Sequence, residues 1–187
     1  EFYLGATDWP QNNVKGFKPK FDGGKFRFVL FDLDGTFGTT DPFNTFEWKQ
    51  NYTFDLIYDT NSRFTEEIEF VTIFLNMLAN EEFVKKFIDT YCLVAGSVFT
   101  PERCSDIINS MAERTYSTLQ QEGANPYSTA NSVINSLKNR QPTMIKALKE
   151  YWRFNLSNTE EQKVELSCNI NEARIMVNDM IVPTNKF

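Results

Sequence analysis

The sequence predicts an α+β fold in which a mostly helical body of residues 65–155 lies between two small β segments. Three observations support this prediction. Cationic and aromatic residues alternate over residues 25–28 and an apolar run continues to residue 31. Consecutive stretches of helical periodicity follow from residue 65, and extended patterns return from residue 163. Because helices follow one another instead of alternating with strands, a doubly wound parallel sheet is disfavoured.

Strands and loops are expected in the first third of the chain. Residues 1–7 form a short apolar segment that leads into a polar loop. The turn signal Asp22-Gly23-Gly24-Lys25 separates an extended run over residues 17–21 from a strand over residues 25–31, so we expect a β-hairpin. The strand becomes continuously apolar, as a strand entering a core does. Residues 38–64 have no clear period and predict a long loop.

Start signals divide the helical body into segments. Thr65, Asn80 and Thr100 each occupy an N-cap position, and the helix after Thr100 has proline at its first position. Residues 127–153 hold one or two further helices, which we expect Pro142 to separate. We interpret the apolar stripes of all these helices as core packing. They comprise Ile68, Val71, Leu75, Leu78, Phe83, Phe87, Ile88, Tyr91, Ile107, Ile108, Met111, Leu119, Val133, Ile134, Leu137, Ile145, Leu148 and Trp152.

The C-terminal segment has extended patterns. Residues 164–166, 173–177 and 181–182 are predicted to be extended, and Asn178-Asp179 is predicted to form a hairpin turn between the last two. We expect residues 1–156 to form one domain and residues 157–187 to be a β-rich appendage or the start of a following domain.

Composition excludes several classes of function. The net charge of −6 argues against nucleic acid or an anionic membrane as the main partner. The chain has no histidine, which removes histidine general bases, Ser-His-Asp triads and His-ligated zinc. Three scattered cysteines predict no disulfide framework, and Cys92 and Cys104 are interpreted as small buried residues of helices. No apolar run approaches the roughly 20 residues of a membrane span, so no transmembrane segment is expected.

The first acidic motif is Asp8-Trp9-Pro10-Gln11-Asn12-Asn13. Asp8 and Asn13 have the spacing of a kinase catalytic loop, in which the Asp receives the substrate hydroxyl and the Asn holds magnesium. Asn13 can provide a neutral carbonyl oxygen, and Asn12 is a less favourable substitute. The competing interpretation is that Asp8 and Asn13 are only turn and capping residues.

The second acidic motif, Phe31-Asp32-Leu33-Asp34-Gly35-Thr36, ends the hydrophobic strand. Asp32 and Asp34 are two residues apart and point to the same side if the extended conformation persists. A carboxylate at such a strand end is a suitable second magnesium ligand. The motif is also similar to the first motif of the haloacid-dehalogenase phosphatases, with Asp32 as nucleophile and Asp34 as acid/base. The order of elements and the poor downstream candidates for the remaining catalytic residues disfavour that alternative.

Taken together, the motifs resemble the carboxyl-terminal half of a CotH-type (spore coat protein H) kinase domain. The residues that carry the resemblance are Asp8–Asn13, Phe31–Gly38, Asn80–Ile88, Phe99–Arg103 and Arg140–Pro142. It covers residues 1–156, and the extended tail resembles the β-rich segment that often follows such domains.

The resemblance implies a protein-kinase-like C-lobe, and an atypical protein Ser/Thr kinase that uses Mg²⁺ and ATP. Asp8 is then the catalytic aspartate, Asn13 a magnesium ligand and Asp32 the metal-binding aspartate, with Asp34 as a close competitor for the last role. We expect a protein hydroxyl as acceptor and an extracytoplasmic location. We also expect the chain to be a fragment whose amino-terminal lobe, with the nucleotide clamp, is missing. The alternative from another class is a non-catalytic kinase-like binding module of the cell surface or envelope.

Overall fold

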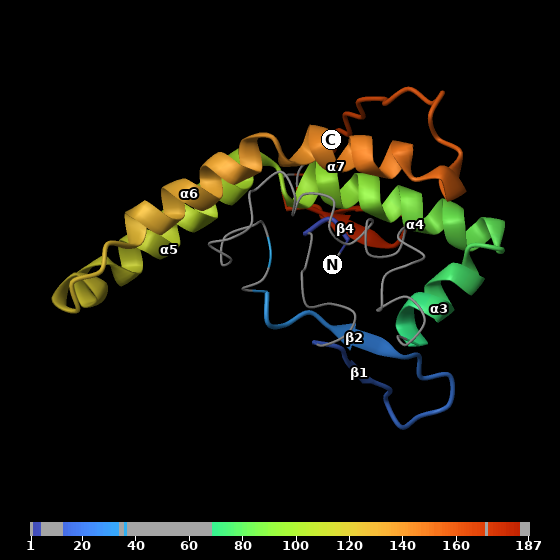
Figure 1. The fold of residues 1–187 in the computed structure, drawn as a ribbon, viewed down its shortest axis with the longest axis horizontal. Coiled ribbons are helices and arrows are strands. Elements are labelled where there is room, and N and C mark those ends of the chain that lie inside the picture. The colour runs from blue at the N-terminus through green and yellow to red at the C-terminus, as the bar shows by residue number, and fades with distance from the viewer. Residues whose placement is uncertain (1, 5–12, 34–35, 37–68, 171, 184–187) are drawn as a thin grey trace. The chain divides into compact units, whose positions relative to one another are not determined.

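The computed structural model describes residues 2–4, 13–33, 36, 69–170 and 172–183 (Figure 1). The chain divides into two compact units, Glu1–Ala79 and Asn80–Phe187. Among its described residues, each unit combines α-helix with one two-stranded antiparallel sheet. This mixture of helices and small sheets agrees with the predicted fold class and is compatible with a kinase-like C-lobe.

The first unit contains the predicted β-hairpin. Strand β1 (Lys15–Phe17) pairs antiparallel with β2 (Arg27–Val29). Lys15 lies opposite Val29, and Phe17 lies opposite Arg27. Strand β2 is shorter than the predicted strand over residues 25–31. Strand β1 lies before the predicted extended run over residues 17–21 and shares only Phe17 with it, so that boundary is wrong.

The Gly-Gly turn of this hairpin has a steric requirement for glycine at two positions. Gly23 has a φ of 80°, which favours glycine. The N–H of Gly24 donates to the carbonyl oxygen of Phe21 at 3.0 Å. A Cβ atom at Gly24 would lie 2.5 Å from the Pro19 carbonyl oxygen, so any side chain there would displace backbone. The predicted turn is therefore confirmed.

The expectation that β2 enters the core is wrong. Phe26, Phe28 and Leu30 are 71%, 62% and 55% exposed, respectively. The β1–β2 pair is a two-stranded ribbon, so a neighbouring element can cover it only in part. Helix α3 (Glu69–Met77) provides one such contact, because the rings of Phe28 and Phe70 meet edge-on with centroids 5.3 Å apart.

Helix α3 has an apolar side, on which Val71 is fully buried. The ring of Phe74 packs against that of Phe2 with centroids 4.9 Å apart. The predicted cap Thr65, the stripe residue Ile68 and the predicted loop over residues 38–64 lie outside the described residues.

The second unit begins with a capped helix, α4 (Glu81–Leu93). The side-chain oxygen of Asn80 accepts the N–H groups of Glu82 and Phe83 at 2.9 and 3.2 Å, which confirms the predicted start. Helix α4 continues directly into a π-helix, η1 (Val94–Val98), in which the N–H of Phe99 donates to the carbonyl of Val94. The helix therefore widens by one residue per turn before it ends.

Helices α5 (Pro101–Gln121) and α6 (Pro126–Lys138) form an antiparallel helical hairpin, visible at one end of Figure 1. Ala112 and Ala130 are buried on these helices. The interpretation of the α5 stripe as core is wrong for Ile107 and Met111, which are 43% and 61% exposed. Because α6 covers only one side of α5, the apolar residues on its other sides remain accessible.

Helix α7 (Arg140–Glu150) provides much of the buried core of this unit. The prediction that Pro142 separates the two helices is wrong. The break between α6 and α7 falls at Asn139, and Pro142 lies in the first turn of α7. An N–H in that turn has no intrahelical acceptor, so proline costs nothing there. Met144 is fully buried, and its carbonyl accepts the hydroxyl of Tyr91 at 3.1 Å.

A short 3₁₀ segment, η2 (Trp152–Phe154), follows α7. The ring of Phe154 contacts those of Phe87 and Tyr151, with centroids 5.4 and 4.9 Å apart. These contacts join the end of the helical body to α4.

The C-terminal segment forms the second predicted hairpin, from β3 (Ile175–Val177) and β4 (Met180–Val182). Asn178 and Asp179 both have positive φ, 49° and 65°, as a type I′ turn requires. The strand predicted over residues 164–166 is absent, because Glu165 alone makes an isolated bridge there. Among the described helices, none has the length and apolar character needed to cross a membrane.

Candidate functional site

The β1–β2 pairing brings together the chain segments that carry two of the predicted site residues. Asn13 lies two residues before β1, and Asp32 lies three residues after β2. Because Lys15 pairs with Val29, both segments leave the ribbon at the same open end, opposite the Gly-Gly turn. Asp8 and Asp34 lie outside the described residues.

Asn13 and Asp32 share an unusual backbone conformation. Their φ angles are 57° and 54°, in the left-handed region that Asn and Asp adopt more readily than other non-glycine residues. At Asp32 the strand has therefore ended, so the extended conformation on which the shared side of Asp32 and Asp34 depended does not persist to Asp32. Because Asp32 has a left-handed conformation, the direction of its side chain does not follow the alternation of strand β2.

The residues after Asp32 are anchored by a local turn. The N–H and the hydroxyl of Thr36 both donate to the carbonyl of Leu33, at 3.1 and 2.6 Å. Thr36 is buried, whereas Asp32 is exposed and Asn13 is half-buried. The turn holds the backbone from Leu33 to Thr36, next to the exposed residue Asp32.

A cation lies at the same end of the ribbon. The ammonium group of Lys15 sits 4.2 Å from the centroid of the Phe31 ring. Both residues adjoin the candidate ligands in sequence, since Lys15 follows Asn13 by two positions and Phe31 precedes Asp32. The open end thus combines an amide, a carboxylate and an ammonium group.

The donor set at this end fits a magnesium ion that is shared with phosphates. Magnesium prefers oxygen ligands and is commonly held by one or two side chains, with phosphate and water oxygens completing the octahedron. Asn13 offers a neutral oxygen and Asp32 an anionic one. In the part of the chain that the structure describes, no three His, Cys, Asp or Glu side chains cluster as a metal site built from protein ligands alone would.

Protein kinases hold their magnesium ions with an asparagine and an aspartate, and residues of these two types flank the β1–β2 hairpin here. A family model described as CotH kinase protein matches residues 1–159 of the chain. The chain therefore belongs to the CotH kinase family. Neither a curated protein nor a solved structure gives a significant match.

The second unit contains a separate cavity that no sequence motif indicated. It has a volume of about 460 Å³ and lies between α4, η1, α7, the segment after α7 and the turn of the C-terminal hairpin. Its lining is mostly apolar and includes Leu93, Ile145 and Leu148, with Asp89, Glu160 and Glu161 as acidic members.

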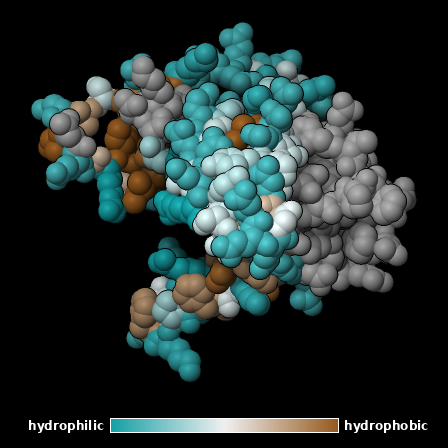
Figure 2. Space-filling model, turned by 90° about the vertical axis from the view of Figure 1, so that its left-hand side faces the viewer, coloured by the Kyte–Doolittle hydropathy of each residue, from teal (hydrophilic) through white to brown (hydrophobic). Residues whose placement is uncertain are grey.

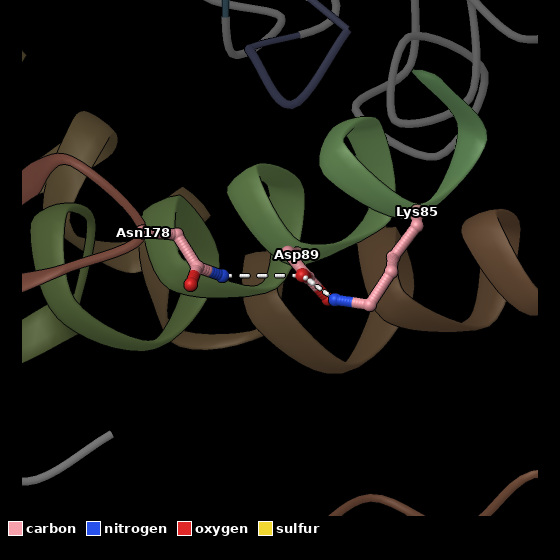
Figure 3. A network of polar contacts seen from close by, with 3 residues as sticks. All are labelled: Lys85, Asp89 and Asn178. Carbon is pink, nitrogen blue, oxygen red and sulfur yellow. Dashed lines mark hydrogen bonds and ion pairs between the residues drawn. The ribbon is translucent and has the colours of Figure 1, made fainter. Parts of the chain in front are cut away.

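A polar network holds the C-terminal hairpin at this cavity. Figure 3 shows the side chains of Lys85 and Asn178 both directed at Asp89. Their nitrogen atoms lie 2.8 and 3.1 Å from the same carboxylate oxygen. The Lys85–Asp89 pair follows the favourable i,i+4 spacing and could be predicted from the sequence, whereas the contact between α4 and residue 178 could not.

Cys92 lines this cavity, and its predicted burial is wrong, since the residue is exposed. Cys104, in contrast, is buried as predicted. Desolvation by the surrounding atoms raises the pKa of the Cys92 thiol, and the negative charges of Asp89 and Glu161 raise it further. Both effects disfavour the thiolate.

The raised pKa predicts a shifted pH profile for alkylation of Cys92. Since only the thiolate reacts, the rate with iodoacetamide should reach its half-maximum at a higher pH in the folded chain than in the chain unfolded in urea. Mass spectrometry of the Cys92 peptide, sampled between pH 7 and 10.5, gives the profile. Steric access would scale all rates without moving the midpoint, so an unshifted midpoint would contradict the prediction. The double substitution D89N/E161Q should move the midpoint part of the way back.

Proposed function

We propose that the chain is the carboxyl-terminal lobe of an atypical, magnesium-dependent protein Ser/Thr kinase that transfers a phosphoryl group from ATP to a protein hydroxyl. The same proposal includes an amino-terminal lobe that carries the nucleotide clamp and an extracytoplasmic location. It also includes a domain boundary between residues 156 and 157. Membership of the CotH kinase family supports it. The single observation that carries it is the antiparallel register that gathers the Asn13 and Asp32 segments at one end of a hairpin.

Each site residue has a separate role in this proposal. Asp8 accepts a hydrogen bond from the acceptor hydroxyl and orients its oxygen toward the phosphorus atom. Asn13 and Asp32 hold the metal–nucleotide complex through an amide and a carboxylate oxygen, with Asp34 as the alternative carboxylate. When bound, magnesium supplies positive charge that stabilises the transferring phosphoryl group. The protein thus contributes position and charge, which dominate this type of catalysis.

Binding of Mg²⁺-ATP tests the proposal before any substrate is known. A ligand present at a hundred times its Kd stabilises the native state by about 2.7 kcal/mol. For a domain of this size that corresponds to a rise in Tm of roughly 5 to 10 °C. The measurement is differential scanning fluorimetry with ATP plus Mg²⁺, ATP plus EDTA, and Mg²⁺ alone. It is made on the 187-residue chain and on a chain extended upstream by the expected lobe.

The expected result is a rise in Tm that requires both ATP and Mg²⁺, at least in the chain extended upstream. Absence of a shift in both chains would contradict the kinase proposal and favour the non-catalytic binding module. A beryllofluoride adduct on Asp32, which mimics an aspartyl-phosphate, would instead support the phosphatase alternative.

A further inference from the structure

The β1–β2 hairpin has a composition unlike the rest of the chain. Residues 14–31 contain five cationic side chains and one carboxylate, a net charge of +4, whereas the whole chain carries −6. The other residues therefore carry −10, so the net charge that argued against an anionic membrane as the main partner does not describe this hairpin. The same segment holds five of the phenylalanines. Apart from its cations and Asp22, it has no side chain that forms hydrogen bonds.

Both kinds of side chain are accessible. The cations Lys15, Lys18, Lys20, Lys25 and Arg27 are all exposed. The exposed apolar side chains include Phe17 at 52%, Phe21 at 66%, Phe26 at 71% and Phe28 at 62%. Figure 2 shows hydrophobic and hydrophilic residues mixed in the lower part of the view, where the hairpin lies by its place in Figure 1.

The strand register places cations beside aromatic rings on both faces of the ribbon. Phe17 and Arg27 are directly opposite and share one face, while Phe28 lies on the other. Near the turn, the Lys18 ammonium group lies 5.7 Å from the centroid of the Phe26 ring. A ligand surface that contacts the turn end therefore meets apolar rings and positive charges together, on either face of the ribbon.

We propose that the β1–β2 hairpin, defined as residues 15–30, docks the protein onto the surface of an anionic lipid bilayer. Its positive charge complements anionic head groups, and each Lys or Arg near such a surface strengthens binding by about fivefold. Its phenylalanine rings can enter the boundary between head groups and acyl chains, while the lysine stems keep their ammonium groups in the head-group layer. This role is independent of the kinase proposal.

A lipid surface fits the hairpin better than a nucleic acid does. Val29 and Leu30 extend the exposed apolar surface at 46% and 55%, and aliphatic side chains gain nothing from base stacking. The hairpin also lacks the amide and hydroxyl side chains that read base edges.

Docking by the turn end is compatible with the candidate site. Phe21 and Phe26 lie at the Gly-Gly turn, whereas Asn13 and Asp32 lie at the opposite end of the ribbon. The three paired residues of each strand separate the two ends by roughly 10 Å. The bilayer would therefore contact one end of the hairpin and leave the other accessible.

Vesicle co-sedimentation of the 187-residue chain tests this proposal. The probes are vesicles of phosphatidylcholine alone and of phosphatidylcholine with 30 mol % phosphatidylserine, each at 0.1 M and 0.5 M NaCl. We expect binding to the anionic vesicles only, weakened at the higher salt concentration. K20Q/K25Q should lower the partition coefficient by about 25-fold, and F21S/F26S by at least about tenfold.

Matched control variants have equally accessible residues outside the hairpin. K86Q/K163Q removes two exposed lysines, and M111S/I170S removes two apolar side chains that are 61% and 63% exposed. Both should bind vesicles like the unsubstituted chain, and all four variants should retain its circular dichroism spectrum.

Equal binding to both vesicle types, or equal loss in the control and hairpin variants, would overturn the proposal. The proposal would also be overturned if the chain bound a fluorescent 30-nucleotide single strand more tightly than the anionic vesicles and the hairpin substitutions abolished that binding. The hairpin would then be a nucleic-acid surface.

Discussion

Replacing Asp32 with asparagine is expected to lower kcat for magnesium-dependent phosphoryl transfer by about a thousandfold, with little change in stability. A carboxylate ligand contributes several kcal/mol through the metal ion, and each 1.4 kcal/mol corresponds to about a factor of ten in rate. Asparagine is the informative substitution, because it also adopts the left-handed conformation that residue 32 has. Alanine would add backbone strain to the loss of the ligand.

The measurement compares D32N with D22N in the chain extended upstream, by transfer of labelled phosphate to a generic protein acceptor. Asp22 lies at the turn of the same hairpin, so D22N removes the same charge at the other end of the ribbon. We expect D22N to retain its activity. Full activity of D32N together with an inactive D34N would assign the metal to Asp34, and full activity of both would contradict the proposed site.

The largest expected effect on stability is at Met144. This side chain is completely buried in α7, and substitution by alanine should lower the free energy of unfolding by about 2–5 kcal/mol, because it removes apolar contacts and leaves a cavity. Met111 provides a control of the same residue type, since it is 61% exposed in α5.

Urea unfolding of M144A and M111A gives both free energies under the same conditions. M111A should change stability by less than about 0.5 kcal/mol, as is usual for surface positions. A similar effect of the two substitutions would show that α7 does not form the core described above. The hydrogen bond from Tyr91 should survive in M144A, because its acceptor is the backbone carbonyl of residue 144.

The features that local chemistry determines could be predicted from the sequence. Asn80 caps α4 through its own side-chain oxygen, and Thr100 with Pro101 starts α5. The Asn178-Asp179 turn follows from the tolerance of these residues for positive φ. Each of these signals acts over three or four residues, so a single chain is enough to recognise it.

Features that depend on what covers a surface could not be predicted. The apolar periodicity of α5 is real, yet Met111 is exposed, because periodicity identifies a face and not its partner. The same holds for the aromatic strand β2, whose rings remain accessible beside α3. The cavity beside Asp89 arises from contacts between residues up to 89 positions apart, which no local pattern encodes.

The candidate site was partly predictable. The motifs and the turn signal predict that Asn13 and Asp32 are candidate ligands on either side of a hairpin. Only the strand register shows that the segments carrying them leave the ribbon at the same end. The end of the strand before Asp32 was missed, because an apolar run continues to Phe31 and conceals the change to positive φ. Asp8 and Asp34 lie outside the described residues, so their roles stay predictions.

The π-helix after α4 has a consequence for comparing this chain with its relatives. An i→i+5 turn holds one residue more than an α-turn, so Val94–Val98 corresponds to a single-residue insertion in the last turn of the helix that begins as α4. Ala95, Gly96 and Ser97, three consecutive residues of this turn, are small and buried. A relative whose helix ends in a regular α-turn should therefore align with a one-residue gap within Val94–Val98, whereas α5, which starts at its own N-cap Thr100, should keep its helical phase.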